Sequence, residues 1–207
     1  MKKMRIRVFR KLLQYSLFSV AIGLNLTSCE EDYFHPEEFS SNQNVNVTTY
    51  DFLTSRPEIF RLFVEIVDAT DYKDSINING ATVLAVKNEA VNAFLELNNI
   101  SSIDEVEMDL LKSLMGKYVF RKSLSTVDNI GTVPAKEMSV SDYGLHFSLK
   151  KDEWKGVQGV GPTVIVVTDL KDEESETDDV TLQVVTTDIK STTGTVQVFG
   201  NDHVFGF

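Results

Sequence analysis

The segment ATVLAVKNEAVNAF (81–94) carries two different apolar patterns in immediate succession. Residues 81–86 form a short continuous apolar run, which is typical of a buried strand. Asn88 then stands where a helix N-cap is expected, and Val91, Phe94 and Leu95 recur at helical spacing. The segment therefore predicts a buried strand that leads directly into an amphipathic helix.

Upstream of this segment, residues 55–58 read Ser-Arg-Pro-Glu, a typical start of a helix. Ser55 is the expected N-cap, Pro57 suits the first turn, and Glu58 follows three residues after the cap. The apolar residues that follow fall on one helical face: Ile59, Phe60, Phe63, Ile66 and Val67. The sequence therefore predicts a helix from about residue 56, packed through this face.

Downstream of the segment, Ser101 with Asp104 and Ser102 with Glu105 are two further capping candidates. They precede a helical stripe made of Leu110, Leu111, Leu114, Met115 and Tyr118. From Gly131 onward the period changes to that of strands. Leu145, Phe147 and Leu149 alternate with polar residues, and three β-branched runs follow at 164–167, 180–185 and 195–199. Helices first and strands later predict an α+β domain over residues 48–207.

Four segments, in the same order, resemble the fasciclin-like family. Residues 48–76 resemble its opening, with a "T-x-x-D-x-L" lead, and residues 110–120 resemble its "LLxYHVV" segment. Residues 192–207 resemble the closing "NGVIHVIDxVL" segment at Gly194, Val196 and Val198. Residues 81–94 resemble "TVFAPTNEAF", with matches at Thr82, Val83, Ala85, Asn88, Glu89, Ala90 and Phe94.

The resemblance implies a fasciclin-like domain, a wedge of two small β-sheets flanked by helices packed in the N-terminal half. It also implies that the first and last matched segments lie near each other in the core. Val83 and Ala85 would then face the core, and Phe94 would anchor a helix. The chain departs from the family at its two histidines, which fall around Lys117–Tyr118 and at Gln197, and at Val86–Lys87 in place of "AP". The ligand-binding residues are therefore left unassigned.

The N-terminus has the pattern of a secretory leader. Six basic residues and no acid lie within residues 1–11, and a mainly apolar run follows at 12–26. Leu26-Thr27-Ser28-Cys29 resembles the lipobox of bacterial lipoproteins, which implies a signal peptide at 1–28, cleavage between Ser28 and Cys29, and lipidation of Cys29. The alternative is an ordinary signal peptide followed by an incidental free cysteine.

Residues 29–47 are polar and acidic without apolar periodicity, and we expect a disordered acidic tether there. Glu30, Glu31 and Asp32 resemble the export signal of surface lipoproteins in the Bacteroidetes. We therefore expect a protein anchored to the bacterial outer membrane through the acylated Cys29 and exposed on the cell surface. Retention on the periplasmic face is the alternative.

The charge balance excludes some partners. The chain holds 20 basic and 31 acidic residues, a net charge of −11. Loss of the leader, with its six basic residues, lowers the net charge to −17. Nucleic acid is therefore not an expected partner, because phosphate binding depends on clustered Lys and Arg. Adsorption to anionic lipid is disfavoured for the same reason.

The sequence contains no pattern that indicates an enzyme. Its three histidines, His35, His146 and His203, have no metal-ligand spacing, no G-x-S-x-G motif occurs, and a Ser-His-Asp triad has no local signature. Gly156, Gly159 and Gly161 precede a strand, so a hairpin loop is favoured over a phosphate-binding loop. The acidic run 171–179 could gather Ca²⁺ but lacks the order of a calcium loop, and a solvated strand connection is favoured.

Together these patterns predict no cofactor, no metal and no catalytic site. The resemblance implies a lipid-anchored adhesion or ligand-binding module with an extracellular protein or glycan partner. The alternative is a structural or accessory subunit of an envelope assembly, in which the segment HVFGF (203–207) would be an interaction strand. If the segment is the last strand of the core instead, its removal should unfold the domain.

Overall fold

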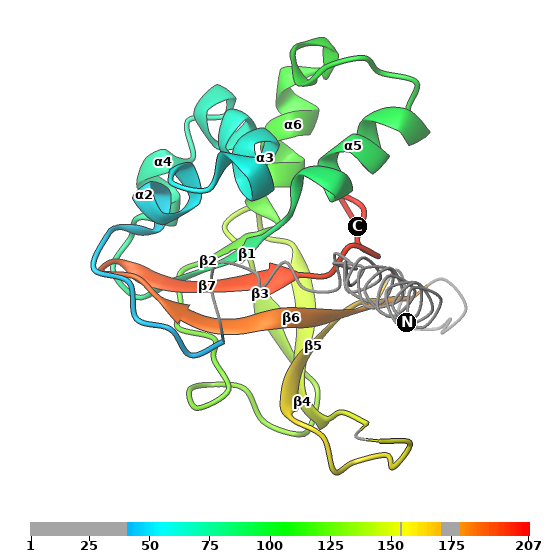
Figure 1. The fold of residues 1–207 in the computed structure, drawn as a ribbon. Helices are drawn as coiled ribbons and strands as arrows, with labels where there is room; N and C mark the ends of the chain where they lie inside the picture. The colour runs from blue at the N-terminus through cyan, green and yellow to red at the C-terminus, as the bar shows by residue number, and fades with distance from the viewer. Residues whose placement is uncertain (1–40, 154, 171–178) are drawn as a thin grey trace, which may run out of the picture. The chain divides into compact units, whose positions relative to one another are not determined.

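The computed structural model describes residues 41–153, 155–170 and 179–207, and Figure 1 shows their arrangement. They belong to a compact unit that spans residues 39–207. Ser28, Cys29, the three acids after it and His35 lie outside the described residues, as does all but the last residue of the acidic run 171–179. No helix of the described residues is long and apolar enough to span a membrane.

The helices come before almost all of the strands, as the sequence predicts for an α+β domain. They are α2 (Thr49–Thr54), α3 (Pro57–Ala69), α4 (Lys73–Ile76), α5 (Asn88–Leu97), the 3₁₀ helix η1 (Ile103–Glu105) and α6 (Met108–Gly116). The strands are β1 (Ala81–Ala85), β2 (Val119–Phe120), β3 (Ala135–Met138), β4 (Gly144–Lys151), β5 (Thr163–Asp169), β6 (Val180–Lys190) and β7 (Gly194–Phe199). The helices gather on one side of the sheet, above β1 and β7 in Figure 1.

The strands form one sheet in the order β2-β1-β7-β6-β5-β4-β3. β1 and β7 are parallel neighbours, in register from Ala81 opposite Gly194 to Ala85 opposite Val198. The matched segments 81–94 and 192–207 therefore lie side by side. The first matched segment, 48–76, also contacts the last, as the family resemblance implies, because Thr49 donates its N–H to the Thr193 hydroxyl at 3.0 Å. Every residue of β1 is buried, Val83 and Ala85 included, because β1 lies between β2 and β7 with helices over it.

The prediction of a wedge of two small sheets is wrong, because β6 pairs with β5 on one side and with β7 on the other and so joins all strands into one sheet. Its first residues, Val180–Gln183, pair with β5, and its later residues, Val184–Lys190, pair with β7. Register shifts between Val184 and Thr186 and between Thr186 and Ile189 bend this strand. One long, bulged strand thus joins what the resemblance presents as separate sheets.

The two ends of the sheet also approach each other. Val140, just after the edge strand β3, donates its N–H to the carbonyl of Val119 in the opposite edge strand β2, at 2.9 Å. Beneath this contact the rings of Phe120 and Phe147 meet edge to face, with centroids 5.2 Å apart. The seven-stranded sheet therefore curls almost into a barrel around an aromatic core.

The helix starts differ from those expected. Ser55 is the C-cap of α2, and its hydroxyl donates to the carbonyl of Phe52, while α3 begins at Pro57 without a side-chain cap. Helix α6 begins later than expected, at Met108, where the Glu107 carboxylate accepts the N–H groups of Asp109 and Leu110. These two hydrogen bonds hold the pKa of Glu107 below its usual range.

Asn88 is the first residue of α5 and does not cap it. Its side-chain oxygen accepts the N–H of Leu62 at 2.9 Å, and its amide nitrogen donates to the carbonyl of Glu58 at 2.9 Å. Leu62 and Glu58 are hydrogen-bond partners within a regular α-helix. The Asn88 amide therefore bridges one turn of α3 and fixes α3 against α5.

Candidate functional site

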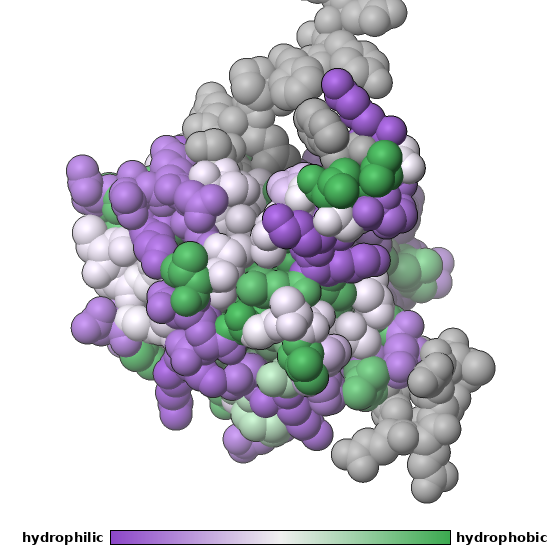
Figure 2. Space-filling model, turned by 90° about the horizontal axis from the view of Figure 1, so that it is seen from below, coloured by the Kyte–Doolittle hydropathy of each residue, from purple (hydrophilic) through white to green (hydrophobic). Residues whose placement is uncertain are grey.

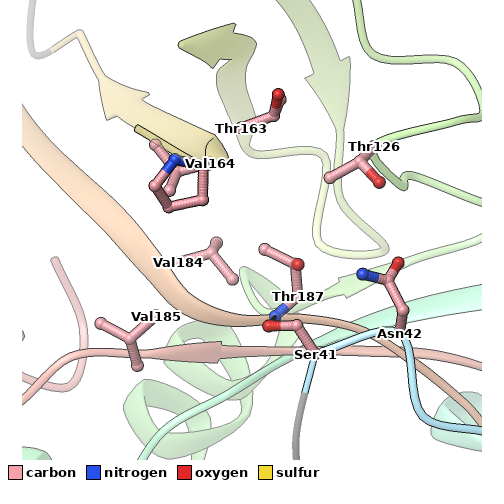
Figure 3. Close-up of a pocket in the computed structure, with 9 residues that line it drawn as sticks. Ser41, Asn42, Thr126, Thr163, Val164, Val184, Val185 and Thr187 are labelled. Carbon is pink, nitrogen blue, oxygen red and sulfur yellow. Dashed lines mark hydrogen bonds between the residues drawn. The ribbon is translucent and has the colours of Figure 1, made fainter. Parts of the chain in front are cut away.

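A pocket of about 310 Å³ lies between β5, β6 and the segment that precedes α2 (Figure 3). Its polar lining is made of hydroxyl and amide side chains: Ser41, Asn42, Thr126, Thr163 and Thr187. Its apolar lining is made of Pro162, Val164, Val184 and Val185. All of these side chains are uncharged at neutral pH.

The pocket exists because β6 stops pairing with β5 partway along its length. The β5–β6 ladder runs from Asp169 opposite Val180 to Val166 opposite Gln183, and beyond Gln183 the strand β6 pairs with β7 instead. The chain diverges at this point, so Val164 of β5 and Val184 of β6 face the gap from opposite sides (Figure 3). The pocket is thus a local opening within the sheet.

The segment before α2 closes one end of this opening. Asn42 donates its N–H to the carbonyl of Thr187 at 2.8 Å, and the Ser41 hydroxyl accepts the N–H of Thr187 at 3.0 Å. Further along, Lys190 donates its N–H to the carbonyl of Gln43, and Val45 donates to the carbonyl of Lys190. Residues 42–45 therefore lie along β6 in parallel, with Asn44 opposite Lys190.

A buried polar network holds the Thr126 side of the pocket in place. The Asp188 carboxylate is almost fully buried and accepts hydrogen bonds from the N–H and the hydroxyl of Thr126. It also accepts from the Gln197 side-chain amide at 2.8 Å, and that same amide donates to the carbonyl of Leu124. Asp188 adopts a positive φ of 59°, a conformation that Asp tolerates better than most residues.

A second buried cluster fixes the C-terminal segment. The Tyr118 hydroxyl lies 2.8 Å from His203 Nε2 and accepts the N–H of Gly206 at 2.6 Å. Burial raises the pKa of Tyr118 and lowers the pKa of His203 to about 3, so both groups are neutral at pH 7. The N–H of Gly206 donates to the Tyr118 oxygen, so the Tyr118 hydroxyl can donate its own proton to Nε2 of the neutral His203.

A third group of polar residues lies beside this cluster. The Tyr143 hydroxyl donates to the buried Asp169 carboxylate at 2.6 Å. Burial, followed by this hydrogen bond and the charge of Asp169, raises the pKa of Tyr143. The Lys117 ammonium lies 4.1 Å from the centre of the Tyr143 ring and donates to the carbonyl of Gly206 at 3.0 Å. These contacts connect α6, β5 and the C-terminal segment, so they serve the fold.

The two positions where the family has histidine are thus buried structural positions here. Tyr118 bonds the C-terminal segment, and Gln197 bonds Asp188 inside the sheet. Lys117, which precedes Tyr118 at the first of these positions, joins the same C-terminal segment. None of the three lines the pocket between β5 and β6.

The segment 203–207 is not a strand, so both expectations for it are wrong in that respect. It is part of the core all the same, because His203 and Phe205 are buried and the ring of Phe205 stacks on Tyr118 with centroids 5.2 Å apart. Phe94 of α5 packs edge to face against Phe205 at 5.5 Å, which confirms Phe94 as a helical anchor. The segment is unavailable as an exposed interaction strand.

The other predicted features fall as follows. Gly156, Gly159 and Gly161 lie between the antiparallel partners β4 and β5, which confirms a hairpin connection. His146 lies in β4 and His203 in the C-terminal segment. Across the described ranges, no three His, Cys, Asp or Glu side chains come together in a way that could hold a metal ion.

The pocket could not be predicted from the sequence, and the reason is topological. Its lining comes from segments far apart in the chain, and Ser, Thr and Val are ordinary residues in strands and turns. The sequence pattern predicted only the run 180–185 as a strand, whereas β6 is eleven residues long and changes partners midway.

No known family profile matches the chain, and no curated protein matches it either. Among solved structures, the chain is similar to a FAS1 domain pair from the insect cell adhesion molecule Fasciclin I. The sequence identity is 21% and the TM-score is 0.48, over 73% of this chain and 46% of that chain. The chain thus spans about half the length of the solved structure to which it is similar.

Proposed function

We propose that this chain is a lipid-anchored envelope protein whose domain, fasciclin-like and non-catalytic, binds an extracellular protein or glycan. The observation that carries the proposal is the pocket between β5 and β6. Its volume of about 310 Å³ is at the lower end of the range for ligand sites. Its lining of hydroxyls, one side-chain amide and aliphatic groups suits an uncharged ligand that is held by hydrogen bonds and apolar contact.

Two observations support the fasciclin-like assignment. The four resembling segments occur in family order, and two of them, 81–94 and 192–207, pair as parallel strands β1 and β7. The residues that match the T-x-x-D-x-L lead also have a local role, since the Thr48 hydroxyl accepts the N–H of Asp51 at the start of α2. The matched positions thus serve strand pairing and helix capping, which specify a fold.

The anchoring part of the proposal is supported by the leader and the Leu-Thr-Ser-Cys sequence that ends at Cys29. Ser41 lies twelve positions after Cys29, and a chain of that length reaches at most ~40 Å. Because Ser41 lies on the rim of the pocket, the pocket would be held within that distance of the lipid. A partner would then be captured close to the membrane surface.

Surface exposure is proposed over periplasmic retention because of Glu30, Glu31 and Asp32. The alternative role as a structural subunit loses its specific support, since the segment 203–207 is not a strand and packs into the core through His203 and Phe205. The face away from the helices carries hydrophobic surface at its centre, bordered by hydrophilic side chains (Figure 2). Such a mixed surface is typical of sites that bind and release a partner.

Metabolic labelling with radioactive palmitate tests the anchor. Replacing Cys29 by Ala should abolish labelling and leave an uncleaved precursor, because the thiol is the acceptor of the lipid. Ser28→Ala is the matched control, since it keeps a small residue before the cysteine and should be labelled as the wild type. Labelled, processed protein from the Cys29→Ala variant would refute the anchor.

Protease treatment of intact cells tests the location, and a glycan and peptide array tests the binding. Surface display predicts that external protease degrades the protein, and complete protection would place it on the periplasmic face. The full-length chain in detergent should bind at least one class of uncharged ligand on the array. Thr163→Lys, which places a long charged chain on the pocket rim, should reduce that binding. Equal binding by this variant would exclude the pocket as the site.

A further inference from the structure

Two connections between strands lie beside each other next to the pocket. The first, residues 121–134, joins β2 to β3, and the second, residues 152–162, joins β4 to β5. Thr126 of the first and Pro162 of the second line the same pocket. Both connections project from the side of the sheet that lies opposite the helices, at the bottom of Figure 1.

Exposed valines gather on these two connections. Gly131, two residues before Val133, accepts the N–H of Leu149 in β4 at 2.7 Å, so the first connection lies against the base of the second. Single exposed valines are ordinary, but several at one end of a domain mark a surface that contacts a partner. Four of the five most exposed large hydrophobic side chains of the described residues form this valine surface: Val127 (76%), Val133 (75%), Val160 (57%) and Val157 (55%).

This end of the domain differs in charge from the helical side. Residues 49–116, which contain the helices, carry five basic and twelve acidic residues, a net charge of −7. The two connections instead have a net charge of zero, from three basic and three acidic residues: Arg121, Lys122, Lys155, Asp128, Asp152 and Glu153. An acidic protein is repelled by anionic surfaces, but a neutral end can approach zwitterionic lipid without that penalty.

The same end receives the proposed tether. Ser41 lines the pocket together with Thr126 and Pro162, and it lies twelve positions after Cys29. A chain of that length reaches at most ~40 Å. A lipid on Cys29 therefore holds the domain by the end that carries the valine surface. Because the tether keeps this surface at a high effective concentration near the bilayer, a small apolar contact is enough to dock it there.

We infer that the valine surface docks on the bilayer to which Cys29 is attached, among zwitterionic lipid headgroups. Transfer of the exposed valines from water into the interface supplies the attraction. The acidic helical side then points away from the membrane, and the pocket lies beside the bilayer. This inference rests on the anchor in the proposed function and adds the orientation of the anchored domain.

The fluorescence of Trp154 tests the contact, because Trp154 is the only tryptophan of the chain and belongs by sequence to the connection 152–162. The full-length chain is coupled through Cys29, its only cysteine, to a maleimide lipid in phosphatidylcholine vesicles. Phosphatidylcholine brominated near the headgroup end of its acyl chains should quench Trp154 at least twofold. Raising the salt from about 0.1 to 0.5 M should not change this quenching, since the contact is apolar. Unquenched Trp154, or quenching lost in high salt, overturns the docking.

Matched aspartate variants locate the contact. Val127→Asp places a carboxylate on the first connection, and Leu97→Asp places the same charge at the end of α5, on a side chain that is 71% exposed. Val127→Asp should reduce the quenching at least twofold, because a carboxylate loses hydration among the headgroups. Leu97→Asp should leave the quenching unchanged. Since Val127 lies outside the connection that holds Trp154, its effect reports docking and not a local change around the indole.

Circular dichroism melting checks that both variants fold, and Val133→Asp replaces Val127→Asp if that variant does not. Quenching equal to that of the wild type in the variant of the valine surface overturns the inference. A chain that sediments as a dimer in detergent, with Trp154 unquenched in vesicles, assigns the valine surface to a second copy and also overturns it.

Chemical coupling at Cys29 separates this test from that of the anchor, because it fixes the attachment point whether or not cells acylate the thiol. Palmitate labelling without quenching overturns the docking and leaves the anchor standing. Quenching in the coupled vesicles without palmitate labelling in cells supports the valine surface and removes the anchor alone.

Discussion

The hydroxyl of Tyr118 lies 2.8 Å from Nε2 of His203, and both side chains are buried although 85 residues separate them in the chain. The hydroxyl joins the end of α6 to the C-terminal segment, because it also accepts the N–H of Gly206. This single oxygen therefore has two partners that no water can replace.

Replacing Tyr118 by Phe should destabilise the domain by about 2 kcal/mol, because His203 and the N–H of Gly206 lose their partner within the core. Tyr50→Phe is the matched control. Its hydroxyl bonds Asp68 at the surface, so its loss should cost under ~0.5 kcal/mol. Urea unfolding of the two variants measures the difference, and equal stabilities would contradict the role of Tyr118.

Stability should fall as pH is lowered from about 6.5 towards 3. Burial lowers the pKa of His203 to about 3, so within this range the unfolded chain binds a proton that the folded chain does not. One such proton is worth about 1.4 kcal/mol per pH unit. The contribution is complete above the unfolded pKa of 6.5 and is lost as the pH falls towards 3.

His203→Gln should flatten this part of the stability profile, measured by urea unfolding at a series of pH values. Phe199→Leu is the control, since the ring of Phe199 packs on His203 with centroids 4.6 Å apart and does not titrate. That variant should lose stability at every pH but keep the slope. A slope unchanged by His203→Gln would show that other groups dominate the acid range.

Asp188→Ala should cost about 3 kcal/mol or more. Ala is strained at the positive φ of 59°, and the change leaves the N–H of Thr126 and the amide of Gln197 without their buried acceptor. Asp142→Ala is the control, because Asp142 has a φ of 58° but lies in a surface turn. This variant should lose only the stability that comes from the backbone strain of Ala, about 1 kcal/mol. Thermal melting separates the two contributions, and equal losses would refute the buried network.

Phe205→Ala should cost about 3–5 kcal/mol, because it removes a fully buried ring that touches Tyr118 and Phe94. Removal of residues 204–207 should unfold the domain for the same reason. Val204→Ala is the milder control, since Val204 is only partly buried. A folded, soluble truncated chain, seen by circular dichroism, would show that the C-terminal segment is dispensable to the core.

Much of the fold follows from local sequence pattern. The buried run at 81–86, the helical stripe from Ile59 to Val67 and the β-branched runs all form the expected elements, because each signal lies within one element. The edge strands β2 and β3 were missed, since Val119–Phe120 is two residues long and Ala135–Met138 is mostly exposed. Short edge strands carry little periodicity of their own.

The capping residues show where local pattern fails. Ser55 and Asn88 have side chains that suit N-caps, but neither caps a helix start. Ser55 is the C-cap of α2, and the Asn88 side chain bonds Glu58 and Leu62 of α3. A polar side chain that can cap its own helix can equally bond a neighbouring one, and only the packing of α3 on α5 decides. The pocket and the Tyr118–His203 pair were unpredictable for the same reason, because tertiary packing alone brings their members together.

The parallel pairing of β1 with β7 has a kinetic consequence. β7 is the last of the described strands in chain order and yet lies inside the sheet, between β1 and β6. A chain that emerges N-terminus first from a ribosome or a translocation channel cannot complete this sheet until Phe199 has emerged. Folding is therefore delayed to the end of emergence, since pairing over such a separation in sequence is slow to form. Under the proposed export, this delay would keep the chain unfolded, and so able to thread through a membrane channel, until nearly the end of its passage.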